Sequence, residues 1–228
     1  MKHQSFEQWL ETIGDIDLPI FDQEIQTLLN ELERQSEIYW NVPAEVGEFF
    51  YKLIVKLRPK RLMEVGTSNG YSAIRMGLAL KQNPAIHVDG DAGVGAQESA
   101  GKLFTIESHG GRFELAAANI RRAGLTDFVV QIKGHAPEIF HSDENLKVGN
   151  FDLLFFDGIK KQHVDFLEQG IGLLKDGGVL IADNVTSHWK DMEAFVRRVE
   201  EMGVFEGRTL EIGDGVYVGI KKGGEASL

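Results

Sequence analysis

Apolar residues recur every three or four positions along the first quarter of the chain. The clearest run comprises Phe21, Ile25, Leu28, Leu29 and Leu32, and a second run extends over 46–57. This spacing places the apolar side chains on one face of a helix. Residues 1–57 are therefore expected to be helical, ahead of the first strand.

From residue 61 onward, short β-rich runs alternate with amphipathic helical stretches. The predicted strands are 62–65, 103–106, 128–132, 151–156 and 179–182, and the predicted helices are 72–80, 112–122, 164–174 and 192–199. Such alternation is typical of βαβ units, which build a mostly parallel sheet. The runs 151–156 and 179–182 are apolar without alternating, so they are expected to be central strands with helices on both faces. The predicted fold class is α/β, with an N-terminal helical segment 1–57 and a core of 58–228.

The last part of the chain departs from this alternation. Two β-rich runs, 209–212 and 216–220, are joined by the Gly-rich sequence Gly213-Asp-Gly215, which predicts an antiparallel hairpin at an edge of the sheet. The stretch 88–100 is rich in Gly, Ala and acidic residues and has little to bury, so a mobile surface loop is expected there. It contains Asp-x-Asp but lacks the spacing of a calcium-binding EF-hand loop.

Composition narrows the classes of protein and partner. The chain has 228 residues, of which 43% are hydrophobic and 26% charged, which suits one folded domain over 1–228. A formal net charge of −11 argues against nucleic acid or an anionic membrane as a partner, since both need clustered Lys and Arg. The expected partner is a small molecule. The chain lacks Cys, an apolar leader and any run of membrane-spanning length, so the expected location is the cytoplasm.

Glycines and acidic residues follow the first two predicted strands, where open α/β sheets bind ligands. Gly66 and Gly70 allow a tight turn, and their Gly-x-x-x-Gly spacing differs from that of dinucleotide sites, which disfavours NAD. The alternative is an ordinary strand-to-helix turn. Glu107 follows the second strand and is suited to bind ribose hydroxyls, or it is a solvated cap on a helix that begins near His109. Glu64 lies in an apolar strand end, so it should have a donor, either a ligand ammonium or backbone amides.

Oxygen-bearing side chains follow the next two predicted strands. Asp157 ends the strand 151–156, and Asp183 and Asn184 end the strand 179–182. Carboxylate and amide oxygens suit a hard divalent cation such as Mg²⁺, Mn²⁺ or Ca²⁺, whereas Zn²⁺ prefers nitrogen or sulfur ligands. A single Asp in such a place is more often a helix cap, but two at successive strand ends favour a metal site.

Several motifs, in the order of these strands, resemble the cation-dependent O-methyltransferases, the group of catechol and caffeoyl-CoA O-methyltransferases. The resemblance runs from about residue 42 to the end of the chain and rests on Leu62-Met-Glu-Val-Gly-Thr-Ser-Asn-Gly-Tyr-Ser-Ala-Ile-Arg-Met76, Gly134-His-Ala136, Phe155-Phe-Asp157-Gly-Ile-Lys160, Ala182-Asp-Asn-Val185 and Ile212-Gly-Asp-Gly215. It implies a Rossmann-like seven-stranded sheet of order 3-2-1-4-5-7-6. It also implies S-adenosylmethionine as the cofactor and a small hydroxylated, catechol-like acceptor. Members are often dimeric through their N-terminal helices and sheet edge, so a homodimer is expected.

The resemblance further implies roles for individual residues. The cofactor-binding set would be Val42, Glu64, Gly66, Thr67, Ser68, Gly70, Tyr71, Ser72, Glu107, His135, Ala136 and Asp157. Within it, Glu64 and the turn that follows would hold the methionine part. Glu107 would bind the ribose, and His135 and Ala136 would border the adenine. The metal ligands would be Asp157, Asp183 and Asn184. Lys160 matches the family's catalytic lysine, which would take up or stabilise the proton charge of an acceptor hydroxyl acidified by the cation.

Residues near these positions offer alternative assignments for the base and for the walls of the pocket. Lys161 is an alternative base, and either lysine could simply begin a solvated helix. His188 and Trp189 are candidates for a wall of the acceptor pocket, Tyr39 and Trp40 for a cover over the pocket or a partner subunit. His163 is expected at the surface rather than in catalysis.

The acceptor itself stays open. Gly158 and Ile159 stand where the mammalian catechol enzyme carries aromatic or imidazole groups, and the stretch between Asn184 and the final hairpin is shorter than in plant caffeoyl-CoA enzymes. Two rival functions remain: metal-independent methylation of nitrogen or carbon, and a non-catalytic binding module of the same fold.

Overall fold

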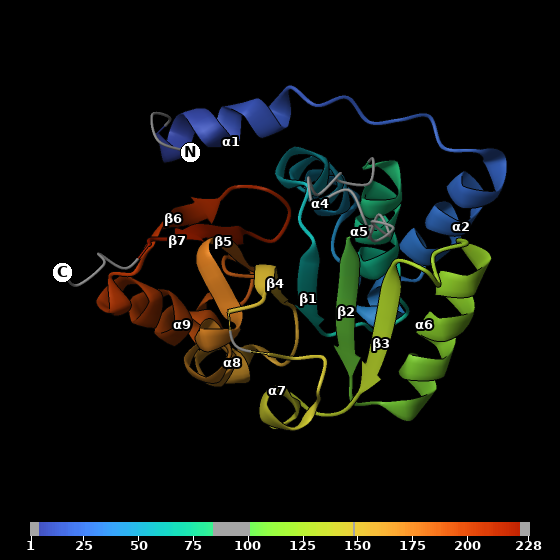
Figure 1. Ribbon diagram of the computed structural model, residues 1–228. Helices are drawn as coiled ribbons and strands as arrows, with labels where there is room; N and C mark the ends of the chain where they lie inside the picture. Colours follow the sequence, from blue (N-terminus) through green and yellow to red (C-terminus); the bar gives the residue numbers. More distant parts are fainter. Residues whose placement is uncertain (1–4, 84–100, 148, 224–228) are drawn as a thin grey trace, which may run out of the picture.

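A seven-stranded sheet forms the centre of the protein in the computed structural model, which describes residues 5–83, 101–147 and 149–223 (Figure 1). Its strand order is β3-β2-β1-β4-β5-β7-β6. The strands are β1 (Arg61–Val65), β2 (Lys102–Glu107), β3 (Val129–Lys133), β4 (Phe151–Phe156), β5 (Leu174–Ala182), β6 (Phe205–Leu210) and β7 (Val216–Lys221). β7 alone runs antiparallel to both of its neighbours, β5 and β6, while the pairs among β1 to β5 are parallel. The predicted mostly parallel sheet, its strand order and its antiparallel C-terminal hairpin are thus confirmed.

The helices begin and end at recognisable signals in the sequence. They are α1 (Phe6–Gly14), α2 (Gln23–Glu33), α3 (Ser36–Tyr39), α4 (Ala44–Leu57), α5 (Tyr71–Gln82), α6 (Gly110–Arg122), α7 (Ile139–Ser142), α8 (His163–Gly170) and α9 (Trp189–Met202), with 3₁₀ turns η1 (Lys160–Gln162) and η2 (Ile171–Leu173). Ser5 and Gln8 form a capping box at the start of α1, and the Asp22 side chain accepts from the backbone N–H of Ile25 at the start of α2. None of the helices in these described ranges is long and apolar enough to cross a membrane.

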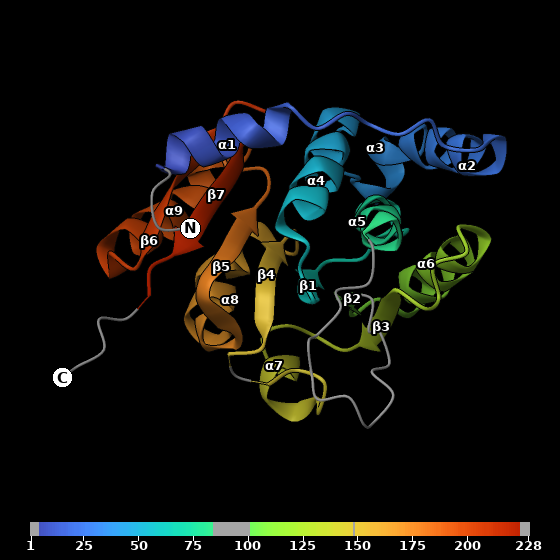
Figure 2. The same cartoon turned by 45° about the horizontal axis from the view of Figure 1, so that its top comes forward.

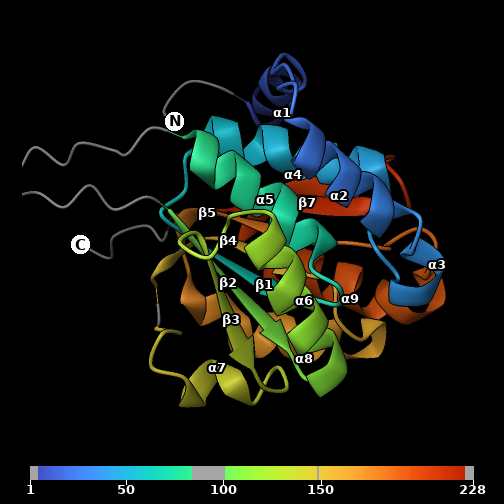
Figure 3. The ribbon, with the colours of Figure 1, turned by 90° about the vertical axis from the view of Figure 1, so that its right-hand side faces the viewer.

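Two helical layers cover the two faces of the sheet. Successive side chains of a strand point to opposite faces, so Phe155 belongs to the same buried cluster as helices α2, α4, α5 and α6, whereas Phe156 belongs to the cluster of α7, α8 and α9. Figure 3 shows α4 and α5 on one side of the sheet and α7 and α8 on the other. Burial of both faces explains why β4 has no polar alternation.

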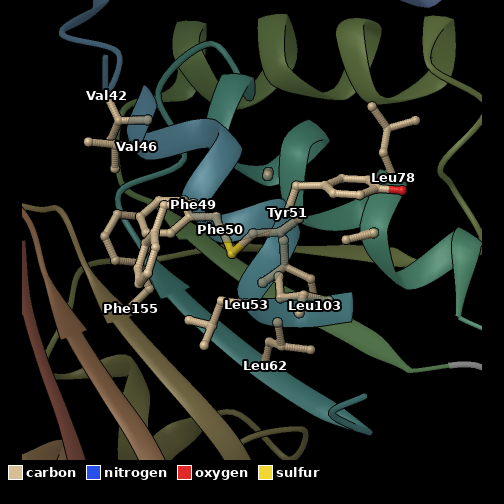
Figure 4. Close-up of a cluster of buried hydrophobic side chains, with 14 of the residues drawn as sticks. Val42, Val46, Phe49, Phe50, Tyr51, Leu53, Leu62, Leu78, Leu103 and Phe155 are labelled. Carbon is tan, nitrogen blue, oxygen red and sulfur yellow. The ribbon is translucent and has the colours of Figure 1, made fainter. Parts of the chain in front are cut away.

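Helix α4 is fixed to the sheet by an aromatic contact. The ring centroids of Phe50 and Phe155 lie 4.5 Å apart in an edge-to-face arrangement, and Leu53 packs nearby in the same cluster (Figure 4). Pro43 directly precedes α4 as its N-cap residue.

The N-terminal helix α1 lies over the C-terminal hairpin (Figure 2). Phe6, Trp9 and Ile13 turn their side chains inward and are buried, and Glu7 pairs with Arg208 of β6 through two hydrogen bonds of 3.0 Å. Helix α1 and the C-terminal hairpin therefore lie on the same side of the molecule.

Several predicted boundaries were wrong. The helix predicted over 164–174 ends at Gly170 and gives way to η2. β5 already begins at Leu174, because Leu174 pairs with Phe151 of β4. The first strand of the hairpin is Phe205–Leu210 rather than 209–212, and the short helix α7 was not predicted. The loop predicted over 88–100 lies outside the described residues.

Candidate active site

A cavity of about 880 Å³ opens at the carboxyl ends of the parallel strands. Its floor comes from the segments that follow β1, β2, β3, β4 and β5, as expected for a ligand site of an open α/β sheet. Its remaining wall comes from the segment between α2 and α4, the start of α6 and the final hairpin. Six of the predicted cofactor-binding residues line it: Gly66, Ser68, Glu107, His135, Ala136 and Asp157.

The turn after β1 depends on glycine at Gly66. Its φ is +102°, and a Cβ added there would lie 2.6 Å from the carbonyl oxygen of Asp157. Only glycine permits both that backbone conformation and such a close approach of two strand ends. This packing brings the turn after β1 next to the segment that carries Asp157.

Glu107 is held by backbone amides at the end of β2. One carboxylate oxygen accepts from the N–H of Ser68 at 2.9 Å and the other from the N–H of His109 at 2.7 Å, and the residue is 7% exposed. The alternative interpretation of Glu107 as a solvated helix cap is therefore wrong. Its buried carboxylate links the turn after β1 to the start of α6. Its carboxylate borders the cavity.

Glu64 lies fully buried behind the cavity wall. The hydroxyls of Ser72 and Thr105 each donate to one of its carboxylate oxygens. Glu64 therefore has donors, as predicted, but within the protein they are side-chain hydroxyls rather than backbone amides or a cation. Burial raises the pKa of Glu64 to about 8, although both hydrogen bonds act in the opposite direction. The carboxyl group is consequently mostly protonated at neutral pH.

Five further predicted cofactor residues are absent from the cavity wall, which consists of described residues only: Val42, Thr67, Gly70, Tyr71 and Ser72. Their side chains support the turn from behind. The Tyr71 hydroxyl donates to Glu33 at 2.7 Å, and Arg75 binds the same carboxylate at 2.9 Å, which ties α5 to α2. The Thr67 hydroxyl lies 2.5 Å from that of Thr105, and Val42 belongs to the hydrophobic core.

Two of the three predicted metal ligands, Asp157 and Asn184, line the cavity, whereas Asp183 directly precedes Asn184 in the chain and is not part of the cavity wall. Asp183 is 1% exposed, and its Oδ1 is buried without a hydrogen-bond partner. Burial, followed by the charge of Asp157, raises the pKa of Asp183 to about 7, and burial also raises the pKa of Asp157. Asn184 has a φ of +63° and lines the cavity beside Asp157. Across the described ranges no three His, Cys, Asp or Glu side chains gather as a metal site, and the predicted set contains two carboxylates and one amide.

Lys160 and Lys161 face different surroundings. Lys160 lines the cavity and binds the Oδ1 of Asp157 at 2.7 Å, with only 17% of its side chain exposed. The Lys161 side chain is 79% exposed and reaches Asp191 at 4.0 Å. Of the two lysines, Lys160 alone borders the predicted metal ligands.

His163 is not at the surface, so that prediction was wrong. It is fully buried, and its two ring nitrogens lie 3.2 Å from the carbonyl oxygens of Phe156 and Ile159. Desolvation by burial lowers the pKa of His163 to about 4, so the ring is neutral. Apolar rings surround it, which the sequence pattern around α8 does not indicate.

The remaining candidates divide between the cavity and the surface. Tyr39, Trp40 and His188 line the cavity, whereas Trp189 does not. The structure adds Arg112, whose guanidinium lies 4.7 Å from the ring centre of Trp40. Sequence reasoning missed this residue, and the one available signal was its place in the first turn of the helix after Glu107.

Comparisons with known proteins agree with this architecture. The family model described as O-methyltransferase matches residues 22–207. A catechol O-methyltransferase of Niastella koreensis is 28% identical over 193 residues, which cover 85% of this chain and 79% of that protein. A caffeoyl-CoA O-methyltransferase of Populus kitakamiensis is 30% identical over 145 residues, covering 63% of this chain and 54% of that protein.

A solved structure shares the fold. The O-methyltransferase from Bacillus cereus in complex with SAH superposes with a TM-score of 0.72 at 22% identity, covering 93% of this chain and 96% of that one. The family model spans most of the chain, from α2 to β6. The protein therefore belongs to the O-methyltransferase family, the S-adenosylmethionine-dependent enzymes that include catechol and caffeoyl-CoA O-methyltransferases.

Proposed function

We propose that the protein transfers the methyl group of S-adenosylmethionine to a hydroxyl group of a small, catechol-like acceptor with the help of a divalent cation. The observation that carries the metal is the unpaired, buried Oδ1 of Asp183, which directly precedes Asn184 and lies close enough to Asp157 for that charge to raise its pKa. A buried carboxylate oxygen without a donor is costly, and a cation would remove that cost. Mg²⁺ is the first candidate and Mn²⁺ or Ca²⁺ the alternatives, because all three prefer oxygen ligands.

The cavity supports an assignment of the cofactor to the end that Glu107 borders. There Glu107 would accept the ribose hydroxyls, and His135 and Ala136 would border the adenine. Gly66 and Ser68 would approach the methionine part through their backbone. The buried predicted residues, Glu64, Thr67, Gly70, Tyr71, Ser72 and Val42, would act indirectly by fixing the shape of this turn.

The chemistry would take place where Lys160 and Asp157 meet. When bound, the cofactor supplies an electrophilic methyl group and the cation lowers the pKa of the acceptor hydroxyl. Asp157 holds the Lys160 ammonium at 2.7 Å, at the edge of the cavity. In this charged form Lys160 would stabilise the oxyanion that forms at the acceptor. To take up the hydroxyl proton itself, the Lys160 Nζ would first have to be in its neutral amine form. The walls of the cavity would hold the acceptor with its oxygen near the group to be transferred.

Two measurements test this proposal separately. Calorimetry with S-adenosylhomocysteine should detect binding, and the absence of binding at millimolar ligand would exclude the cofactor assignment. Methyl transfer to a panel of catechols should be lost in EDTA and in Asp157→Ala. Activity that survives both would overturn the metal mechanism and leave the protein a metal-independent methyltransferase.

The role of Lys160 has a matched control in its neighbour. Lys160→Met should lower kcat roughly 100-fold or more, in line with loss of a general base. Lys161→Met should retain activity, since that side chain points to solvent. Equal effects of the two changes would argue against a specific role for Lys160, and turnover of any acceptor excludes the non-catalytic module.

Three expectations from the sequence stay predictions: one domain over 1–228, a cytoplasmic location and a homodimer. Light scattering of the purified protein measures the last of these directly, and a mass near 25.4 kDa would argue against a dimer.

A further inference from the structure

The final hairpin reaches the metal end of the cavity through its turn. The backbone carbonyl of Asp214 accepts from the N–H groups of Thr186 and Ser187, each at 3.0 Å, and the carbonyl of Gly215 accepts from the N–H of Val185 at 2.9 Å. These three bonds attach the hairpin turn to the residues that directly follow Asn184 in the chain. The turn between β6 and β7 therefore helps to determine where Asn184 lies.

Glycine is required on both sides of Asp214. Gly215 has a φ of +86°, and a Cβ there would overlap the Thr186 side chain. Gly213 has a φ of +53°, its N–H donates to Glu45 at 2.8 Å, and a Cβ would lie 2.7 Å from Val46. The turn is thus held between α4 and the segment after β5, which leaves the Asp214 backbone little freedom.

The Asp214 carboxylate lines the cavity and meets a predicted metal ligand. Its Oδ2 accepts from the Asn184 side-chain Nδ2 at 3.3 Å. Its charge also contributes to the raised pKa values of Asp157 and Asp183, which places it within electrostatic reach of both. An ionised carboxylate only accepts hydrogen bonds, so it attracts the NH₂ branch of the amide rather than the oxygen.

The direction of the amide decides whether Asn184 can bind a cation. An amide carries its oxygen and nitrogen on opposite branches, so an NH₂ group committed to Asp214 leaves the oxygen as the free branch. With the amide reversed, the NH₂ group would face the cation site, and a cation would lose one of its oxygen ligands. The unpaired, buried oxygen of Asp183, the residue before Asn184, independently indicates a ligand beside Asn184.

We propose that Asp214 is a positioning residue that holds the Asn184 amide with its oxygen toward the cation shared by Asp157 and Asp183. The inference rests on the metal site of the proposed function. It gives a role to the Gly213-Asp-Gly215 motif, which the cofactor and metal assignments do not use. Outer partners of metal ligands of this kind typically change metal affinity by about 10- to 100-fold.

The test measures Mn²⁺ binding to the full chain by calorimetry and by electron paramagnetic resonance, without turnover. Asp214→Asn should weaken Mn²⁺ binding about 10-fold or more, while S-adenosylhomocysteine affinity and the melting temperature stay close to those of the wild type. Glu211→Gln removes the same charge from an exposed position on the approach to the turn and should leave Mn²⁺ affinity unchanged.

A second variant, Asn184→Asp, separates the positioning role of Asp214 from the effect of its negative charge on the cation. In Asn184→Asp both branches of the side chain are oxygens, so its orientation no longer matters, and Asp tolerates the positive φ of this position. Adding Asp214→Asn to this variant should cause no further loss of Mn²⁺ affinity. A loss of equal size in both backgrounds would show that Asp214 acts by its field or as a direct ligand, and would overturn the proposal.

The remaining outcomes are also decisive. Equal Mn²⁺ affinity of the wild type and Asp214→Asn overturns the positioning role alone. Failure of the wild type to bind Mn²⁺ overturns the metal site and this inference together. A fall in S-adenosylhomocysteine affinity and in melting temperature that accompanies the Mn²⁺ loss assigns Asp214 to the structure of the turn instead.

Discussion

The buried carboxyl of Glu64 should make the protein less stable as the pH rises. The ordinary pKa of 4.5 applies to the unfolded chain, and burial raises the pKa in the folded protein to about 8. Between these two values the folded state binds more protons than the unfolded state. The free energy of unfolding therefore falls with increasing pH across this window, by up to ~1.4 kcal/mol per pH unit.

Glu64→Gln removes this titration while keeping the shape of the side chain. From the two pKa values, the wild type should lose about 2.5 kcal/mol between pH 5 and pH 7 because of Glu64 alone. The Gln amide oxygen can accept from one of the hydroxyls of Ser72 and Thr105 and its NH₂ group can donate to the other, because a hydroxyl can rotate to serve as donor or acceptor. The variant should thus gain stability relative to the wild type as the pH rises, whatever its constant offset.

Urea unfolding at pH 5, 6, 7 and 8 measures this difference. The other raised carboxyl groups, Asp157 and Asp183, titrate in both proteins, so most of their contribution cancels in the comparison. If the two curves run parallel within about 0.5 kcal/mol, the carboxyl of Glu64 is not held protonated by burial and the reasoning fails. A steeper fall in the variant would contradict the sign.

Three further predictions concern the turn, the core and the buried imidazole. Gly66→Ala should destabilise the protein by about 1–3 kcal/mol through its positive φ alone and weaken S-adenosylhomocysteine binding, measured by thermal unfolding and calorimetry; unchanged affinity would contradict the tight contact with Asp157. Phe50→Ala should cost about 3–5 kcal/mol in urea unfolding because it empties the site beside Phe155, and a loss below 1 kcal/mol would be incompatible with that packing. Burial lowers the pKa of His163 to about 4 in the folded protein, below its ordinary 6.5, so acidification favours the unfolded chain. Between pH 7 and pH 5 the free energy of unfolding should therefore fall by about 2 kcal/mol more in the wild type than in His163→Gln, and an equal acid sensitivity of both proteins would refute the neutral burial of His163.

Local patterns sufficed for much of the fold. The alternation of strand and helix signals predicted the α/β class, and the glycine-rich turn before Val216 predicted the terminal hairpin, because periodicity and turn residues act over a few neighbours in the chain. Boundaries failed where tertiary pairing overrode the pattern. β5 extends back to Leu174, which pairs with Phe151, although Lys175 to Gly178 do not resemble a buried strand.

The sequence by itself also determined which residues follow the strand ends, and thereby the set of groups at the cavity: Gly66, Glu107, Asp157, Lys160 and Asn184. Only the tertiary structure decided which side chains face the cavity and which support it from behind. Glu64 and Tyr71 turn away from it, and His163 is enclosed by aromatic rings. It likewise brought Asp214 to Asn184 across thirty positions of the chain. The physical reason is that side-chain direction and burial depend on non-local packing, which no local pattern records.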